Sequence, residues 1–115
     1  MADIILLTTQ SAPEEASPDP ARLLAGEYKT RTFNQWDAKK IWSGIWESTP
    51  GKVKVDYTGE WEFCHFIEGE AVLTNEQGQS WRLKAGDGFI IPDGFKGTWE
   101  TVKAVKKHYV IVAVE

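Results

Sequence analysis

Few side chains in this sequence could act as a nucleophile, acid, base or metal ligand inside a folded core. The chain has one cysteine, Cys64, and two histidines, His65 and His108. Glu62 lies close to Cys64 and His65 in the sequence, between two aromatic residues. A carboxyl group in apolar surroundings must be protonated, hydrogen-bonded or ion-paired. With a raised pKa it can act as a general acid or base near neutral pH. Glu62 is therefore the candidate catalytic residue, although it could also be a paired structural residue or point to solvent.

A strand over residues 61–67 would place these side chains on two faces, because successive residues of a strand alternate. Cys64 would share a face with Glu62, and His65 would point the other way. Only a bulge could then bring Glu62 and His65 to one metal ion. Cys64 and Glu62 together supply only two ligands. As a nucleophile, Cys64 would need a nearby base to lower its pKa, and none is evident on its face.

Short strands must position these residues, because runs of β-forming residues alternate with turn residues along most of the chain. The expected strands cover residues 42–48, 52–57, 61–67, 71–74, 80–83, 89–91, 97–102 and 108–114. Turn sequences such as Thr49-Pro50-Gly51 and Pro92-Asp93-Gly94 separate them. Many short strands, with a turn about every 8–12 residues, are typical of a β-sandwich or barrel.

The first part of the chain differs from the rest, and we expect an N-terminal lead over residues 1–31 and a single domain over residues 32–115. The lead is rich in proline and acidic residues and has little to bury. Within it, Ile4–Thr8 could form a short strand, and Asp19–Leu24 one turn of helix capped by Asp19. Residues 36–41 are the other possible helix.

Composition limits the class of protein. A chain of 115 residues with 42% hydrophobic and 26% charged residues suits one globular domain. A net charge of −4 with scattered basic residues argues against nucleic acid or a membrane surface as partner. One cysteine allows no intrachain disulfide. The first residues include an acid and an apolar run too short for a signal peptide, so a cytoplasmic location is expected.

Two segments resemble the two sequence motifs of the cupin superfamily. In residues 59–70, Glu62 lies seven positions before Gly69, and in residues 86–97, Gly86 lies six positions before Pro92. More narrowly, residues 40–112 resemble the EutQ-like cupins. That resemblance is carried by Trp46-Glu47, Thr49-Pro50-Gly51, Gly94-Phe95-x-Gly97-x-Trp99 and Lys107-His108-Tyr109. It implies an all-β, cupin-type jelly-roll barrel of antiparallel strands.

The resemblance also raises the question of a metal. Cupins typically hold an ion with three histidines and one glutamate, a donor set that suits iron, manganese, nickel or zinc. Two histidines in total cannot supply three. With Glu62 as the motif glutamate, the first two histidine positions fall on Val55 and Tyr57, or one residue later on Asp56 and Thr58. The third falls on Gly97. We therefore expect no metal and no cofactor.

The family register implies an aromatic-lined pocket around Glu62. Glycine at position 97 would leave extra room there, and either Trp46 or Glu47 would add to the wall. Tyr57, Lys107 or Tyr109 could partner the Glu62 carboxylate. The predicted ligand-binding residues are Glu47, Tyr57, Glu62, Cys64, Trp99, Lys107 and Tyr109.

A mostly apolar concavity with few polar anchors is typical of small-molecule sites. The leading hypothesis is a metal-free cupin that binds a compact polar metabolite, such as a sugar derivative, a ureide or an amino-acid-like compound. The alternatives are a cupin enzyme, a hydrolase or isomerase similar to ureidoglycine aminohydrolases, and a structural or regulatory module. The run Tyr109–Val114 is apolar on both faces and needs cover on both, which predicts a homodimer.

Overall fold

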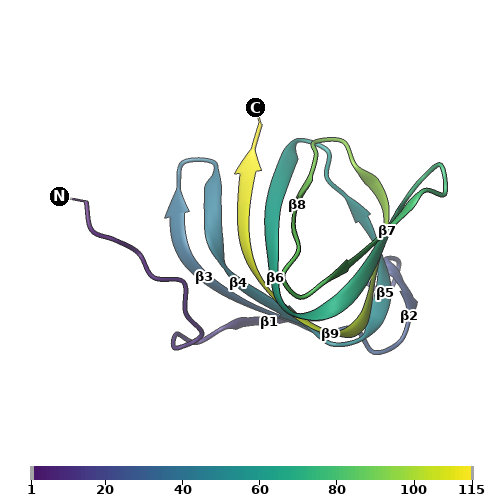
Figure 1. The fold of residues 1–115 in the computed structure, drawn as a ribbon, viewed down its shortest axis with the longest axis horizontal. Helices are drawn as coiled ribbons and strands as arrows, with labels where there is room; N and C mark the ends of the chain where they lie inside the picture. The colour runs from purple at the N-terminus through teal and green to yellow at the C-terminus, as the bar shows by residue number, and fades with distance from the viewer. Residues whose placement is uncertain (1, 115) are drawn as a thin grey trace.

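Antiparallel strands form one hydrogen-bonded sheet that curls into a barrel in the computed structural model, which describes residues 2–114 (Figure 1). The strands are β1 (Glu14–Ala16), β2 (Leu23–Ala25), β3 (Thr30–Ala38), β4 (Ile41–Ser48), β5 (Gly51–Asp56), β6 (Glu60–Asn75), β7 (Ser80–Lys84), β8 (Gly88–Ile91) and β9 (Lys96–Ala113). This confirms the predicted all-β fold. Among the described residues there is no helix of the length and hydropathy needed to cross a membrane. Met1 and Glu115, the outer ends of the predicted lead and domain, lie outside the described residues.

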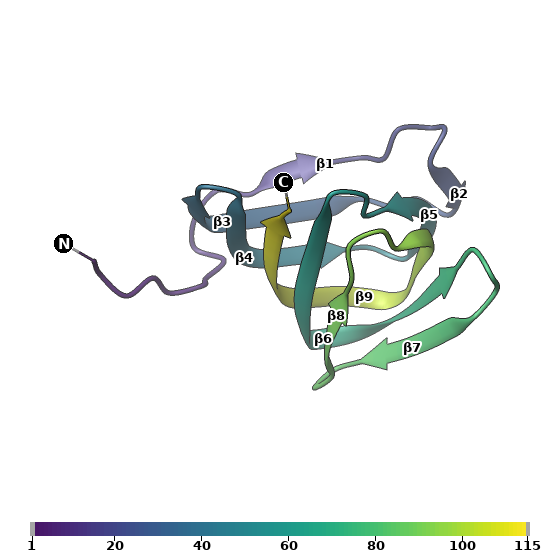
Figure 2. The same ribbon diagram turned by 90° about the horizontal axis from the view of Figure 1, so that it is seen from above.

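Two long strands, β6 and β9, hold the barrel together because each runs through both of its halves. They pair with each other from Glu60↔Ala113 to Asn75↔Gly97. β9 also pairs with β5 at one end and with β4 at the other, while β6 pairs with β8 and then with β7. Seen from above (Figure 2), β9 separates β3 and β4 from β6.

A bend in β6 replaces the break predicted at residues 68–70. The pairing register with β9 shifts between Phe66 and Ala71, and such bulges turn a strand without ending it. Gly69 has a positive φ of 96°. A Cβ there would overlap the carbonyl oxygen of Ala104, so only glycine fits. The predicted strands on either side, 61–67 and 71–74, are therefore two halves of one strand.

The predicted alternation of side chains along β6 is confirmed. Cys64 and Phe66 are fully buried inside the barrel, whereas Phe63, on the opposite face, is 39% exposed. Phe66 packs with Val53, Leu73, Ile91 and Trp99 in the main core cluster. The core lies on the concave side of the sheet, next to the side chains that line the cavity described below.

The predictions for the lead were wrong in detail. Ile4–Thr8 forms no strand; the first strand is β1, which pairs with β3. Asp19–Leu24 forms no helix. Its first residues make a turn, in which Asp19 accepts hydrogen bonds from the Ala21 and Arg22 amides, and the chain continues as β2 beside β5. A single helical turn is costly to nucleate, whereas the edges of β3 and β5 offer ready main-chain partners.

Residues 36–41 also form no helix. They end β3 and begin β4, and the two strands join through a two-residue loop, Lys39-Lys40. Such loops need positive φ angles, and Lys40 has a φ of 62°. A register shift between Asn34 and Trp36 interrupts the alternation of β3. Because the turn has no glycine or asparagine and the alternation is broken, the sequence hides this hairpin.

Candidate functional site

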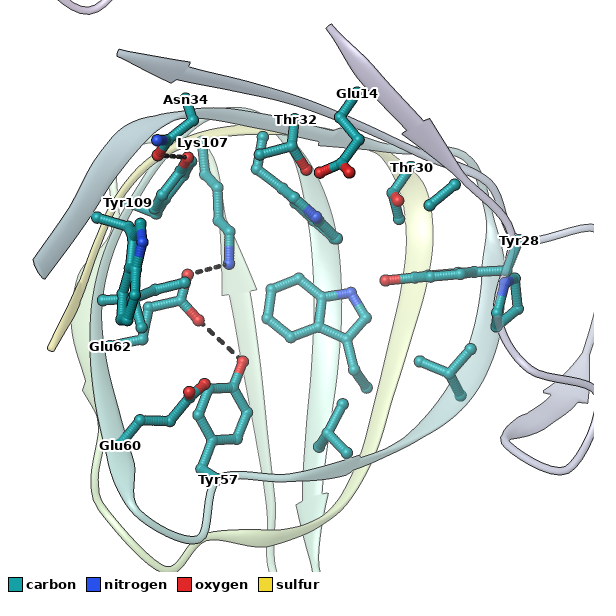
Figure 3. A pocket seen from close by; sticks show the side chains of 18 of the residues that line it. Glu14, Tyr28, Thr30, Thr32, Asn34, Tyr57, Glu60, Glu62, Lys107 and Tyr109 are labelled. Carbon is teal, nitrogen blue, oxygen red and sulfur yellow. Dashed lines mark hydrogen bonds and ion pairs between the residues drawn. The ribbon is translucent and has the colours of Figure 1, made fainter. Parts of the chain in front are cut away.

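A cavity of about 580 Å³ opens on the concave side of the barrel (Figure 3). Its walls come from β1, β3, β4, β5, β6 and β9. Six aromatic side chains line it: Tyr28, Trp42, Trp46, Tyr57, Trp99 and Tyr109. So do four acidic and two basic ones: Glu14, Asp37, Glu60, Glu62, Arg22 and Lys107. The cavity therefore combines apolar walls with charge.

The centre of the site is an ion pair between Lys107 on β9 and Glu62 on β6. The Lys107 Nζ lies 2.8 Å from Glu62 Oε2, and each residue is only 3% exposed. The Tyr57 hydroxyl donates a hydrogen bond of 2.8 Å to Glu62 Oε1 (Figure 3). Both carboxylate oxygens are thus engaged. The predicted partnering of Glu62 is confirmed, with Tyr57 and Lys107 as the partners.

Two tryptophans and a cysteine complete the surroundings of the Lys107 ammonium. Its Nζ lies 4.5 Å from the ring centroid of Trp46 and 4.6 Å from that of Trp99, within the range of cation–π attraction. It also donates to Cys64 Sγ at 3.3 Å. The Trp99 indole is fixed in turn by a 2.9 Å hydrogen bond to Thr101 Oγ1. The ammonium is therefore held by the protein on several sides.

These contacts set the protonation of Lys107 and Cys64. Burial alone lowers the pKa of Lys107, but the charge of Glu62 and the hydrogen bonds to Glu62 and Cys64 outweigh it, and the net pKa is raised. Burial raises the pKa of the Cys64 thiol to about 12. At neutral pH Cys64 is therefore a neutral thiol, and Glu62 is the charge that holds the lysine protonated. A thiol in this state is a poor nucleophile.

The three tyrosines of the cavity are also shifted. Burial raises the pKa of Tyr28 to about 12 and that of Tyr57 well above its ordinary value, with the nearby Glu62 as a further cause at Tyr57. Burial, followed by Glu62, raises the pKa of Tyr109 to about 12. The Tyr109 hydroxyl donates to Asn34 Oδ1 at 2.7 Å. All three phenols are thus protonated at neutral pH.

Three other carboxylates also line the cavity. Glu14, Asp37 and Glu60 make no ion pair with another side chain of the described residues. Burial and the neighbouring Glu62 raise the pKa of Glu60. Arg22 donates instead to the carbonyl oxygen of Lys54. In Figure 3, the carboxylates of Glu14 and Glu60 lie on different sides of the cavity.

The structure brings five of the predicted binding residues to the cavity: Tyr57, Glu62, Trp99, Lys107 and Tyr109. Cys64 contacts the Lys107 ammonium but does not line the cavity. Of the two alternatives left open on β4, Trp46 lines this cavity and Glu47 does not. Alternation along β4 turns Trp46 inward and Glu47 outward, where it pairs with Arg31 and Lys106.

Sequence reasoning missed several lining residues. Glu60 could have been found, because it lies two positions from Glu62, and Trp42 would follow from Trp46, four positions away, had Trp46 been chosen over Glu47. Thr30, Thr32 and Asn34 of β3, and Glu14 of β1, carried no comparable signal. The strands that supply them begin before residue 32, in the part of the chain read as a lead.

The side chains present do not fit the metal of other cupins. Val55 and Tyr57 line the cavity, whereas Asp56 is exposed and bonded to Thr58, so the first of the two possible motif registers holds. Val55 carries no ligand atom, and the Tyr57 hydroxyl is bonded to Glu62. Within residues 2–114, no three His, Cys, Asp or Glu side chains are grouped closely enough to hold an ion.

Gly97 does not leave extra room in the cavity, contrary to the prediction. A Cβ at this position would overlap the carbonyl oxygen of Thr74 on β6. Glycine here permits the close approach of two backbones. The two histidines lie elsewhere: His65 and His108 face each other across β6 and β9, with stacked rings 5.8 Å apart, on the outer face of the barrel.

Comparison with known proteins places this geometry in a family. Residues 37–109 match the family model of the EutQ-like cupin domain. No curated protein sequence matches the chain.

Among solved structures, a protein of unknown function of the DUF861 family from Pseudomonas syringae pv. tomato is similar, with a TM-score of 0.80 and 25% identity over 92% of this chain and 46% of that one. The Clostridium difficile EutQ protein gives a TM-score of 0.67 and 15% identity over 76% of this chain and 65% of that one. Ectoine synthase from P. lautus gives a TM-score of 0.64 and 14% identity over 86% of this chain and 70% of that one.

The last two likenesses show the fold alone, and the chain spans only about half of the Pseudomonas protein and 65% of the Clostridium one. The family model, by contrast, covers more than half of this chain, over the strands that carry Glu62 and Lys107. The chain belongs to the EutQ-like cupin family.

Proposed function

We propose that this protein binds a compact polar metabolite in the cavity of its barrel. The observation that carries the proposal is the Lys107–Glu62 ion pair in the cavity wall, buried among aromatic rings. Apolar side chains of similar volume would often stabilise a fold as well as a buried ion pair does. Charge kept in the wall of a cavity of about 580 Å³, a volume within the range of small-molecule sites, supports a role in binding.

The polar groups of the cavity suggest how a ligand would lie. An ammonium has three N–H donors, and two of those on Lys107 go to Glu62 and Cys64. The third can meet an acceptor oxygen of the ligand. Glu14 and Glu60, which have no ion-pair partner in the described residues, can accept from hydroxyl, amide or ammonium groups. A ligand with an acceptor near Lys107 and a donor near one of these two carboxylates would satisfy the lysine and that carboxylate.

The geometry favours binding over the enzyme alternative. Glu62 already accepts two hydrogen bonds, so it has no free role as a general acid. The raised pKa of the Cys64 thiol works against a nucleophile, and the raised pKa of Lys107 works against a base. Each group suits the positioning of a ligand better than proton or acyl transfer.

A screen of sugar derivatives, ureides and amino-acid-like compounds, read by tryptophan fluorescence and calorimetry, tests the proposal. For a compound that binds, Glu62→Gln should weaken affinity at least about tenfold, because the amide changes the charge beside Lys107. Glu47→Gln, on the outer face of β4, is the matched control and should bind like the wild type. A confirmed ligand that binds Glu62→Gln with unchanged affinity would show that the site is misplaced.

A further inference from the structure

We propose that the Lys107 ammonium is the resident cation of this barrel, occupying the place that a metal ion takes in other cupins. The proposal concerns how the charge of the cavity is held. It can therefore be tested without a ligand, and its failure would leave the proposed binding function standing.

The first argument is the position of the ammonium. Glu62 is the motif glutamate, and in this chain its Oε2 contacts Lys107 Nζ at 2.8 Å. The other carboxylate oxygen accepts from Tyr57, one of the positions where the motif would carry histidine. Both oxygens that could ligate an ion are therefore engaged with protein donors. Lys107 reaches them from β9, the strand hydrogen-bonded to β6.

The second argument is that the protein surrounds this ammonium as it would surround a bound ion. The carboxylate of Glu62 and the sulfur of Cys64 supply acceptors, and the faces of Trp46 and Trp99 supply π electrons. The side chain of Lys107 is only 4% exposed. A divalent cation entering here would meet a positive charge at close range in a place of low dielectric, which is strongly unfavourable.

The third argument is that the remaining histidine positions of the motif, Val55 and Gly97, offer no ligand atom. Val55 presents an apolar side chain to the cavity. Gly97 allows β9 to approach the Thr74 carbonyl so closely that no side chain fits there. In this barrel the side-chain ammonium of Lys107 therefore takes the place of a metal ion. The positions that would carry the other metal ligands have also changed in shape.

Chemical rescue of Lys107→Ala tests this directly. The substitution removes three methylene groups and the ammonium, a volume that matches n-propylammonium. Added propylammonium should raise the melting temperature of the variant, by about 5 °C at ten times its dissociation constant, and the rise should then continue with the logarithm of its concentration. The neutral isostere 1-propanol and an equal concentration of sodium chloride should do much less. Equal rescue by the alcohol, or no rescue by the amine, would overturn the proposal.

A second measurement on the wild type applies even if Lys107→Ala does not fold. The protein is produced in medium supplemented with manganese, iron, nickel and zinc, desalted, and analysed for metal content. The proposal requires well under one equivalent of any of these metals. One tightly held equivalent that disappears in Glu62→Gln would overturn it, because the carboxylate would then be a metal ligand.

Discussion

The inner and outer faces of the paired strands β6 and β9 carry opposite kinds of chemistry. Inside, Glu62 and Lys107 form an ion pair that is almost closed to water. Outside, three residues after Glu62 on β6 and one after Lys107 on β9, His65 and His108 stack across the same two strands and remain partly exposed. Both histidines of the chain are therefore on the outer face, away from the cavity. Which face a side chain occupies therefore decides its role more than its type does.

The two faces also differ in how their side chains are satisfied. Among the described residues, no buried side-chain nitrogen or oxygen lacks a hydrogen bond. On the outer face, by contrast, an apolar row crosses three strands: Ile90 and Val110 both lie opposite Phe63. Phe63 and Ile90 are 39% and 61% exposed. The buried polar atoms of the inner face are therefore hydrogen-bonded within one chain, whereas the outer face exposes apolar side chains to solvent.

The largest expected effect comes from breaking the inner pair. Lys107→Met keeps most of the volume but leaves the Glu62 carboxylate buried without a cation, and should lower the free energy of unfolding by about 3–5 kcal/mol. His108→Ala, the matched change on the outer face, should change it by about 0.5 kcal/mol or less. Urea denaturation measures both. Equal losses at the two positions would remove the distinction between the faces.

A smaller loss is expected from Tyr57→Phe. The change removes one hydrogen bond to the buried carboxylate of Glu62 and should destabilise the protein by about 2 kcal/mol. Tyr109→Phe removes a similar bond, but to the neutral side chain of Asn34, and should cost about 1 kcal/mol. Parallel urea denaturation of the two variants compares them. A larger loss at Tyr109 would mean that the Glu62 carboxylate does not dominate the inner face.

The exposed apolar row on the outer face is consistent with the predicted homodimer, which stays a prediction. Ile90→Lys places a charge in the exposed apolar row, and should raise the dissociation constant of a dimer formed through this face at least about tenfold, equivalent to about 1.4 kcal/mol. Sedimentation at micromolar concentration, with and without the substitution, measures this. A monomeric wild type would show that the apolar row needs no second copy.

The smallest effect is expected at the histidine pair. Burial, followed by the neighbouring His65, lowers the pKa of His108. A base whose pKa is lowered by folding contributes stability above its unfolded pKa of about 6.5, and that contribution is lost as the pH falls through the lowered value. His65→Ala should move the pKa of His108 back up, as measured by NMR titration. No change would mean that the stacked rings do not interact electrostatically.

Alternation made the centre of the site predictable from the sequence. Tyr57, Glu62 and Lys107 were expected near one another because strands of period two and the motif register fix which side chains point inward. The wrong choices arose where local signals are weak. Glu47 and Trp46 are adjacent, so an error of one residue exchanges the two faces.

The parts that could not be predicted depend on pairing between distant segments. Glu14 reaches the cavity only because β1 adds to the edge of β3. The sequence of a three-residue strand does not indicate which strand it pairs with. The Lys39-Lys40 loop has no turn residue to mark it. The close approach at Gly97 exists only once β6 and β9 are paired.

The state of the Lys107 ammonium can be observed directly by NMR on protein labelled with ¹⁵N-lysine. The account predicts one ammonium signal at neutral pH that exchanges slowly with water, shows contacts to the indole protons of Trp46 and Trp99, and is absent from Lys107→Met. One equivalent of Mn²⁺ should leave it unchanged. A wild-type spectrum without a protected ammonium, or one in which that equivalent broadens the signals around Glu62, would contradict the account.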